Sequence, residues 1–554
     1  MKSYQTLRIL TMVILGIPVS AQIMTVLPSE AAGPQSLAVQ ILLPHTQRYP
    51  TGAPVAVRVT GGFEDNGLPS NGIGLDRQGI IQIDFSWPGK GNATLNQKSG
   101  GTYDTRGPAC LKALRDVLLF AMNEKADQNG KKLSDLCQGI APIASNAGMI
   151  GFSNGGNATL CAAGIHADTL SDLAWIVNWE SPVGDGMPGA ECGMVIKPDL
   201  EGQPGNPEFN PAYDDSTGGW DLSTLLYSDT VNINKGHITI PGASLRGGLY
   251  FDINNNGLVD WGADFVLMPV QVSALKDTTV YYSELMVGAA TGKHLIPLPP
   301  PKHIAAKRAV EDFWSFRNGK KWIPAIVQKI KKLMFIVVAF QEDHVQSAPD
   351  KPHVLIQYDG FRSANGRFMR LNPDQSYVEA VSGKTVEGVP DNDAFAEYDH
   401  VTIRGRFLPN VPDGSPNLDA GVPLNEGVVA AVCELADRTA YNNVSPQLQS
   451  VITAVRADVP RPDGFVLHPN HPNPFNGSTV LTMTLARREE IFLTVVDLNG
   501  RPVRTLLRGI LPAGSHSAAW NGTDAEGRAV PSGMYFCIGK TGSGTRMIKM
   551  LLTK

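Results

Sequence analysis

The stretch Gly151-Phe152-Ser153-Asn154-Gly155-Gly156 decides the fold of the larger part of this chain. It follows an apolar run, 147–152, with the length of a buried strand, and it precedes residues 157–165, which begin a helix. Glycine is needed on both sides of the serine, because a Cβ at either position of so sharp a turn would clash with the neighbouring strand or helix. The turn lifts the Ser153 hydroxyl clear of the sheet and so predicts a nucleophile; the alternative is a serine that only caps the helix.

Strand-like and helical runs alternate around this turn. The alternation predicts an α/β protein whose sheet is flanked by helices. The helix expected at 109–123 has its apolar residues at helical spacing. The predicted buried strands are 54–59, 79–85, 147–152, 174–179 and 334–340, and the expected last strand is 377–381.

The composition excludes several classes of protein. A chain of 554 residues suits two or three domains, and 42% hydrophobic with 18% charged residues excludes a largely disordered chain. The 52 acidic residues outnumber the 47 Lys and Arg, so we expect no nucleic-acid partner. The six cysteines are even in number, and sequence proximity predicts Cys110–Cys137 and Cys161–Cys192 disulfides.

With its glycine turn in this context, the chain resembles the α/β-hydrolase superfamily over residues 37–445. The nearest resemblance is to secreted esterases of the feruloyl esterase and polyester depolymerase type, and a looser one is to prolyl oligopeptidase-like enzymes. The resemblance implies a Ser–acid–His triad, an acyl-enzyme, a small-molecule or polymer ester substrate and no organic cofactor. Two alternatives stay open, namely a prolyl oligopeptidase-like peptidase and an inactive cell-surface binding protein on a hydrolase scaffold.

Two places are expected to supply the backbone N–H groups of an oxyanion hole. Asn154 follows the nucleophile, and its N–H can face the developing charge with the helix dipole behind it. The resemblance places the second donor in Thr60-Gly61-Gly62-Phe63, on Gly62 or Phe63. This sequence has Thr60 where the family has His, a change that a backbone donor survives.

The acid and the base are predicted from the order Ser, acid, His along the family's chain, with the acid after the next-to-last strand and the histidine after the last. Asp343 lies just past a predicted strand and is the expected acid; the alternative is that it only begins a solvated loop. His400 follows the expected last strand and is the predicted base, with His353 as the alternative. We set His344 aside because it is adjacent to Asp343 along the chain.

A second motif lies in a long insertion, residues 195–305, which we expect to cap the site. It has oxygen ligands at alternating positions and a glycine for a sharp turn, which predicts a structural calcium ion. The expected ligands are Asp252, Asn254, Asn256 and Asp260. Position twelve of such a loop is Ala263, with Asp264 one place later, so an Asx-rich turn without metal is the alternative.

The N-terminal segment, residues 1–21, is expected to be an export signal. Lys2 and Arg8 precede the apolar run 9–19, and small residues precede Gln22. The run is too short to cross a bilayer, which needs roughly 20 apolar residues, and no later stretch is long enough. We therefore expect a secreted or cell-surface protein without a membrane span in its mature form.

The C-terminal segment is predicted to be a small immunoglobulin-like β-sandwich, residues 476–554, after a proline-rich linker, 446–475. Short apolar runs there alternate with polar turns such as Asn499-Gly500. The segment resembles the type IX secretion sorting domain, which implies the type IX machinery as a partner; the alternative is an accessory domain without a sorting role. The blocks that carry the resemblance are 468–476, 496–503, 511–516, 520–522, 532–536 and 549–552.

Overall fold

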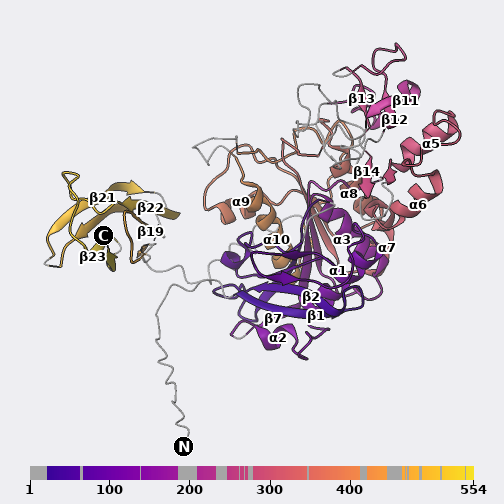
Figure 1. Ribbon diagram of the computed structural model, residues 1–554. Coiled ribbons are helices and arrows are strands. Elements are labelled where there is room, and N and C mark those ends of the chain that lie inside the picture. The colour runs from indigo at the N-terminus through magenta and orange to yellow at the C-terminus, as the bar shows by residue number, and fades with distance from the viewer. Residues whose placement is uncertain are drawn as a thin grey trace, which may run out of the picture. The chain divides into compact units, whose positions relative to one another are not determined.

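The chain folds into two compact units, Ser20–Pro446 and a second unit that contains Gln447–Lys554. Figure 1 shows the computed structural model along the chain. The described residues are 22–62, 67–137, 139–184, 209–232, 246–260, 263–267, 269–272, 279–345, 348–411, 421–445, 465–467, 470, 473–485, 489–498, 500–511, 514–542 and 544–553. The predicted export signal lies outside these residues, as does 446–464 of the predicted linker.

An eight-stranded sheet forms the centre of the larger unit, in the order β1-β2-β4-β3-β7-β8-β16-β17. β1 and β2 pair antiparallel, as do β2 and β4, and every later neighbour pairs in parallel. β4 lies between β2 and β3, so chain order and spatial order differ there, and the sheet is mostly parallel with helices on its faces, as predicted for an α/β protein. The strands are β1 (Gln22–Ser29), β2 (Gly33–Leu42), β3 (Ala53–Val59), β4 (Ile81–Phe85), β7 (Pro142–Phe152), β8 (Trp175–Trp179), β16 (Met334–Val338) and β17 (Met369–Leu371).

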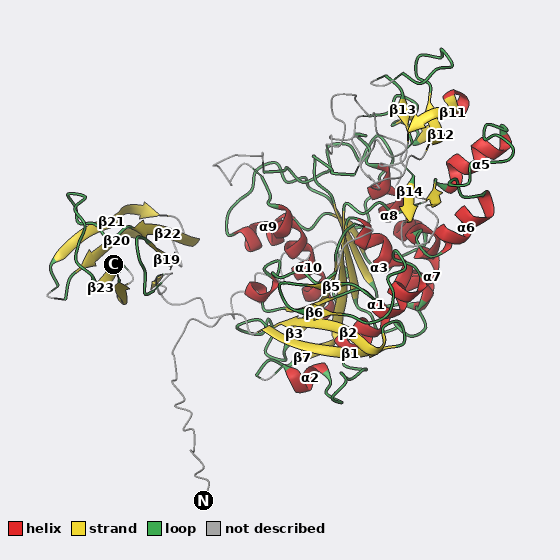
Figure 2. Ribbon diagram, viewed as in Figure 1, coloured by secondary structure: helices red, strands yellow, loops and turns green. Residues whose placement is uncertain are grey.

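Helices cover both faces of this sheet, as expected where right-handed crossovers join parallel strands. Figure 2 shows α1, α3 and α7 on one side and α9 and α10 on the other. A small hairpin, β5 (Gly91–Asn92) and β6 (Gln97–Lys98), precedes α1. The helices are α1 (Pro108–Ala121), α2 (Leu133–Leu136), α3 (Asn154–Ile165), α7 (Ile323–Lys329), α8 (Pro352–Ser363), α9 (Gln375–Ser382) and α10 (Leu424–Ala440). Short 3-10 helices cover Leu75–Gln78, Leu222–Thr224 and Gly319–Trp322.

The five predicted buried strands overlap β3, β4, β7, β8 and β16, although β4 begins at Ile81, β8 begins at Trp175 and β16 ends at Val338; the expected last strand is wrong. Residues 377–381 belong to α9, and the last strand is β17. The Asp374 side chain accepts the N–H of Ser376 and caps α9, while Gly383 ends the helix at φ 74°. These caps define a short helix in which Tyr377 and Val378 are buried. In the sequence, this short apolar run is similar to that of a buried strand.

The insertion builds small sheets and a hydrophobic core of its own. Leu225, Phe251 and Trp314 belong to this core, which is separate from the core around the main sheet. Its end differs from the predicted one, because α6 continues the packing beyond residue 305. The elements are β9 (Tyr213–Asp214), β10 (Gly219–Trp220), β11 (Leu225–Asn232), β12 (Arg246–Phe251), β13 (Phe265–Val266), β14 (Val270–Val272), β15 (Thr279–Tyr281), α5 (Glu284–Gly292) and α6 (Lys307–Ser315).

The C-terminal unit consists of a three-stranded and a four-stranded antiparallel sheet around one apolar core. It starts earlier than predicted: β18 and the buried Phe475, whose N–H donates to the carbonyl of Leu551, fall in the expected linker. The sheets are β18 (Phe465–Leu467), β19 (Thr479–Leu485) and β22 (Gly514–Trp520), and β20 (Glu489–Val496), β21 (Pro502–Leu511), β23 (Gly533–Thr541) and β24 (Gly544–Leu552).

The structure bears on two further predictions, one about disulfide bonds and one about membrane-spanning helices. Cys110 in α1 and Cys137 after α2 are separate buried thiols, so the proximity-based pairing of these two is wrong. Cys161 is also a buried thiol, and its expected partner Cys192 lies outside the described residues. Of the helices in the described ranges, none has both the length and the apolar character needed to cross a membrane.

Candidate active site

Ser153 stands between β7 and α3 in a backbone conformation that side chains rarely adopt, with φ 48° and ψ −128°. The flanking glycines permit this turn, as predicted. A Cβ on Gly151 would lie 2.3 Å from the Cα of Gly156, and one on Gly155 would lie 2.3 Å from the carbonyl oxygen of Val59. Any other residue at either position would push the helix away from the sheet.

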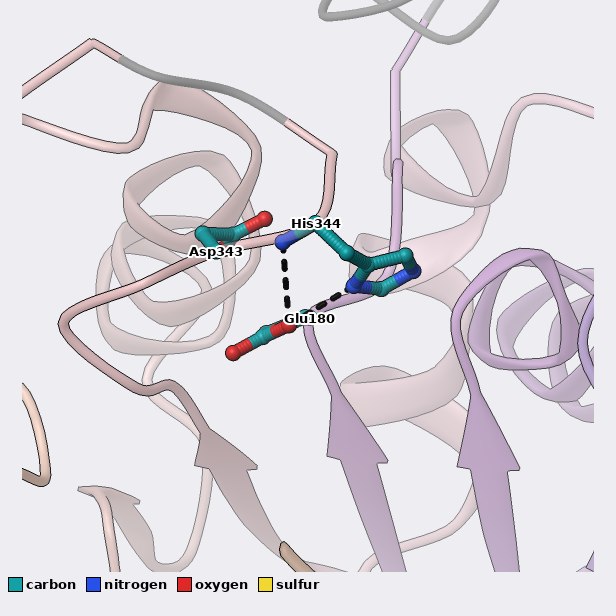
Figure 3. A group of neighbouring side chains, drawn as sticks. All are labelled: Glu180, Asp343 and His344. Carbon is teal, nitrogen blue, oxygen red and sulfur yellow. Dashed lines mark hydrogen bonds and ion pairs between the residues drawn. The ribbon is translucent and has the colours of Figure 1, made fainter. Parts of the chain in front are cut away.

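A histidine and a carboxylate from two neighbouring strand ends complete the arrangement around the serine. The Nε2 atom of His344 lies 2.9 Å from the Ser153 hydroxyl oxygen. Its Nδ1 atom lies 2.7 Å from the carboxylate of Glu180, which follows β8 directly (Figure 3). A carboxylate at Nδ1 places the imidazole proton there and leaves Nε2 free to accept the serine proton.

Packing fixes the His344 ring and its carboxylate in this geometry. The Trp179 ring stacks on the imidazole with centroids 4.6 Å apart and planes 8° apart. The other oxygen of Glu180 accepts the N–H of Phe340 at 3.1 Å, and Glu180 is only 1% exposed. A site held this way needs little rearrangement to react.

The charges around the imidazole favour its protonated form. Burial works to lower the pKa of His344, but the hydrogen bond and charge of Glu180, with the charge of Asp343, outweigh it and raise that pKa above its ordinary value. Burial, followed by the charge of Asp343, raises the pKa of Glu180. The imidazole can therefore hold a proton taken from Ser153.

Asp343 is close to the site, but the structure does not place it in the predicted role. Its carboxylate lies 2.9 Å from Nε2 of His353 and accepts the N–H of Val345 at 2.7 Å. Polar side-chain atoms of Asp343, Glu180 and His344 lie within 4.8 Å of one another. Figure 3 shows these three side chains. Asp343 and the alternative base His353 thus form a buried pair behind the acid that contacts His344.

His400 is also corrected, because its partner is a different carboxylate. Its Nδ1 atom lies 2.6 Å from Asp350, which accepts the hydroxyl of Tyr213 through the same oxygen, also at 2.6 Å. Tyr213 belongs to the insertion, and a Cβ on Gly218 would lie 2.1 Å from the His400 ring. His400 therefore joins the insertion to the main sheet's loops.

The two predicted oxyanion places lie beside the nucleophile as far as the structure describes them. Asn154 is the first residue of α3, and its side-chain amide contacts the carbonyl of Gly62 at 3.4 Å. A Cβ on Gly61 would lie 3.1 Å from the Cβ of Ser153, so this loop passes directly over the serine. Gly62 has φ 66°, and Phe63 lies outside the described residues.

The predicted calcium loop is a tight turn lined with oxygen atoms. Both oxygens of Asp252 accept backbone N–H groups, and Asp260 accepts the side-chain amides of Asn254 and Asn256 at 2.7 and 2.6 Å. Asp264 accepts two further N–H groups and so faces the same turn. Its carboxylate lies one residue after position twelve, which is alanine in this sequence. The four predicted ligand side chains could offer a metal ion only oxygen atoms, the kind of ligand that Ca²⁺ prefers.

Sequence reasoning missed Glu180 and His344. Both follow strands that were predicted, but each lies one strand earlier than the family's order suggested. The available signal was position alone: Glu180 directly follows a buried parallel strand and His344 comes six residues after another, and the ends of such strands form the edge where α/β sheets place their sites.

Comparison with known proteins gives matches to parts of the chain. The FlgD Ig-like domain family matches residues 473–537. Basal-body rod modification protein FlgD of Salmonella typhimurium is 38% identical over 61 residues, which are 11% of this chain and 26% of that protein. This chain thus spans about a quarter of the length of that curated relative.

The solved structures that are similar to parts of the chain include an esterase and the protein PorU. A Pyrobaculum calidifontis esterase is 12% identical, covering 34% of this chain and 52% of that one, with a TM-score of 0.23. PorU from Porphyromonas gingivalis is 19% identical, covering 17% of this chain and 10% of that one, with a TM-score of 0.15. At these TM-scores the likeness is local, and the fold of the larger unit rests on its own strand order.

Proposed function

We propose that this protein is a serine hydrolase that cleaves ester bonds with Ser153 as nucleophile, His344 as general base and Glu180 as the acid that orients the imidazole. The supporting observation is the unbroken contact from the Ser153 hydroxyl through both ring nitrogens of His344 to the Glu180 carboxylate. Ser153, His344 and Glu180 follow three adjacent strands. Nucleophilic catalysis requires a nucleophile within hydrogen-bonding distance of a base that a third group orients, and these side chains have that arrangement.

In the proposed reaction, His344 takes the Ser153 proton while the serine oxygen attacks the ester carbonyl carbon. The N–H groups of Asn154 and of Gly62 or Phe63 would stabilise the oxyanion. When the tetrahedral intermediate collapses, the bond to the alkoxy group breaks, and His344 gives its proton to the departing alcohol. Water then attacks the acyl-enzyme as His344 takes its proton. When the bond from the acyl carbon to the serine oxygen breaks, His344 returns that proton to Ser153 and the carboxylic acid leaves.

The insertion is proposed to act as the cap over a small-molecule or polymer ester. Its own core and its contacts through Tyr213 to Asp350 and through Asp215 to Arg404, at 2.9 Å, support a separate body held against the main unit. Such caps select substrates. Comparing ester and amide substrates separates an esterase from the prolyl oligopeptidase-like alternative.

The test is labelling of the purified full chain by a fluorophosphonate, together with hydrolysis of p-nitrophenyl esters. We expect labelling that disappears in Ser153→Ala and turnover that falls by at least about 10³-fold in Ser153→Ala and His344→Ala. His400→Ala is the matched control, because it also loses a histidine paired to a carboxylate and should keep most of the activity. A folded protein that neither labels nor turns over would contradict the proposal and favour an inactive binding scaffold.

The cellular location of the protein and its metal ion are proposals as well. We propose export by residues 1–21 and delivery to the cell surface or medium by the type IX machinery through the C-terminal unit, supported by the sequence blocks described above. A chain without residues 465–554 should then remain in the periplasm, and cell fractionation would detect the hydrolase unit there. We further propose a structural Ca²⁺ at Asp252, Asn254, Asn256 and Asp260, supported by their all-oxygen donor set.

A further inference from the structure

The side chain of Arg106 is buried directly behind the loop that passes over the nucleophile. Its Nη2 atom donates to the carbonyl oxygens of Thr60 at 3.0 Å, Gly61 at 2.9 Å and Gly62 at 2.9 Å. The guanidinium lies 4.2 Å from the centroid of the Trp87 ring, and the residue is 2% exposed. One buried cation thus gathers three successive carbonyls of a single loop.

These carbonyls determine where the N–H groups of the loop point. The C=O of Gly61 and the N–H of Gly62 belong to one planar peptide, in which the two bonds point in opposite directions when the peptide is trans. A carbonyl held on Arg106 therefore turns the Gly62 N–H away from the guanidinium. Since Gly61 is in close approach to Ser153, the peptide that follows it lies at the nucleophile.

The backbone of Arg106 is held in a costly conformation that serves this contact. Thr105 and Arg106 both have positive φ, 54° and 62°, a conformation that costs a non-glycine residue free energy. Arg317 holds this segment by donating to the carbonyls of Asp104 at 2.6 Å and Thr105 at 2.7 Å. Asp104 also caps α1 by accepting the N–H of Ala109 at 2.6 Å.

Arg317 itself connects the segment to the insertion. Its guanidinium lies 4.1 Å from the ring centroid of Phe313, a residue of the insertion's core, and donates to the Phe313 carbonyl at 2.9 Å. The insertion, the strained turn and the loop over the serine are therefore linked by two arginines.

We propose that Arg106 is a positioning residue that fixes the peptides of Thr60, Gly61 and Gly62 so that this loop presents an N–H to the oxyanion formed at Ser153. The inference rests on the proposed function, because it assigns a role within that site. Arg106 touches no reacting atom in this scheme; it acts through the backbone it holds.

The experiment uses Arg106→Met, which keeps the length of the stem but cannot donate, and Arg106→Lys, which keeps the charge. Arg438→Met is the matched control: Arg438 is also buried, lies 4.1 Å from the Phe368 ring centroid and donates to the carbonyl of Ser445 at 2.7 Å, but on α10. For each full-length variant, kcat and KM for a p-nitrophenyl ester, the melting temperature and hydrogen exchange of peptides covering residues 58–62 are measured.

We expect kcat in Arg106→Met to fall by about 10- to 10³-fold with KM within about threefold, because a misplaced oxyanion donor weakens only the transition state. Arg106→Lys should recover part of this loss, and exchange of the loop amides should rise in Arg106→Met. Arg438→Met should lower the melting temperature while leaving kcat unchanged. If Arg106→Met does not fold, Arg106→Lys must show the same pattern, a lower kcat with a nearly unchanged KM.

Two results would overturn the inference. One is a folded Arg106 variant with wild-type kcat and unchanged exchange of the loop; the other is a loss of kcat in Arg438→Met equal to that in Arg106→Met, which would make the effect one of general stability. Failure of the proposed function is a different result: the wild-type protein would then show no Ser153-dependent turnover, while the exchange measurement would still report whether Arg106 holds the loop.

Discussion

Replacing Glu180 by glutamine tests the assignment of the acid most directly. The substitution keeps the size of the side chain but removes the charge that lies 2.7 Å from Nδ1 of His344. A hydrogen bond to a charged group contributes about 1.5–3 kcal/mol, which corresponds to roughly 10- to 150-fold in rate. An amide can also favour the wrong tautomer of the imidazole, and in the Ser-His-Asp triad such a swap lowers kcat by about 10⁴-fold. We therefore expect kcat to fall by between about 10²- and 10⁴-fold.

The pH dependence gives a second readout of the same substitution. Glu180 raises the pKa of His344 by its hydrogen bond and charge, and only the neutral imidazole can accept the serine proton. Activity should therefore rise with pH as His344 loses its proton, and in Glu180→Gln this rise should move to lower pH. The assay is kcat/KM for a p-nitrophenyl ester across the pH range in which both proteins stay folded.

Asp343→Asn is the matched control for the acid. It removes a carboxylate from the same cluster, but the described hydrogen bonds of that carboxylate go to His353 and Val345 rather than to the ring of His344. We expect a smaller loss, about tenfold or less, since the tautomer of His344 is kept. A loss in Asp343→Asn equal to that in Glu180→Gln, or full activity in Glu180→Gln, would refute the assignment.

Other predictions follow from the geometry. Gly155→Ala should lower the free energy of unfolding by about 1–3 kcal/mol in urea titration, because its Cβ would lie 2.3 Å from the Val59 carbonyl; an unchanged midpoint would contradict the packing. Burial alone would raise the pKa of Asp343, but its contacts with His353 and the charge of Lys351 outweigh burial and hold that pKa below its ordinary value. The Asp343 carboxylate therefore stabilises the folded protein above about pH 4, and this stabilisation is lost as the pH falls. Asp343→Asn should accordingly cost about 1.5–3 kcal/mol at neutral pH and less in acid, and a cost that does not change with pH would argue against the pair. Ca²⁺ should raise the melting temperature and a chelator should lower it in the wild type and in the surface variant Asp168→Asn, but not in Asp260→Asn; a response retained in Asp260→Asn would remove the metal site.

The fold was predictable where the signal was local. The buried strands around Ser153 are continuous apolar runs, and the glycines at its turn allow the close approach of neighbouring backbone that this turn requires. The antiparallel strands β1 and β2 and the short helix α9 were missed, because pairing across the sheet and helix caps are read poorly from apolar pattern alone.

Of the candidate site, Ser153 and the neighbouring Asn154 and Gly62 were predicted from sequence, but Glu180 and His344 were not. Glu180 and His344 are far from Ser153 in sequence, and their contact depends on which neighbouring strand ends bring them together. The family's usual order put the acid and base one strand later, at residues that turned out to have partners of their own, His353 for Asp343 and Asp350 for His400. Spacing along a chain cannot separate such pairs, since each combines a carboxylate with an imidazole.

The separate core of the insertion has a consequence for how this protein can change. Residues that fold around Leu225 and Trp314 are stabilised by one another rather than by the strands that carry the chemistry. A mutation in this core is therefore expected to disturb the packing of the insertion more than the packing of the main sheet. Under the proposed function, substrate choice and bond cleavage would then be properties that mutation can change separately.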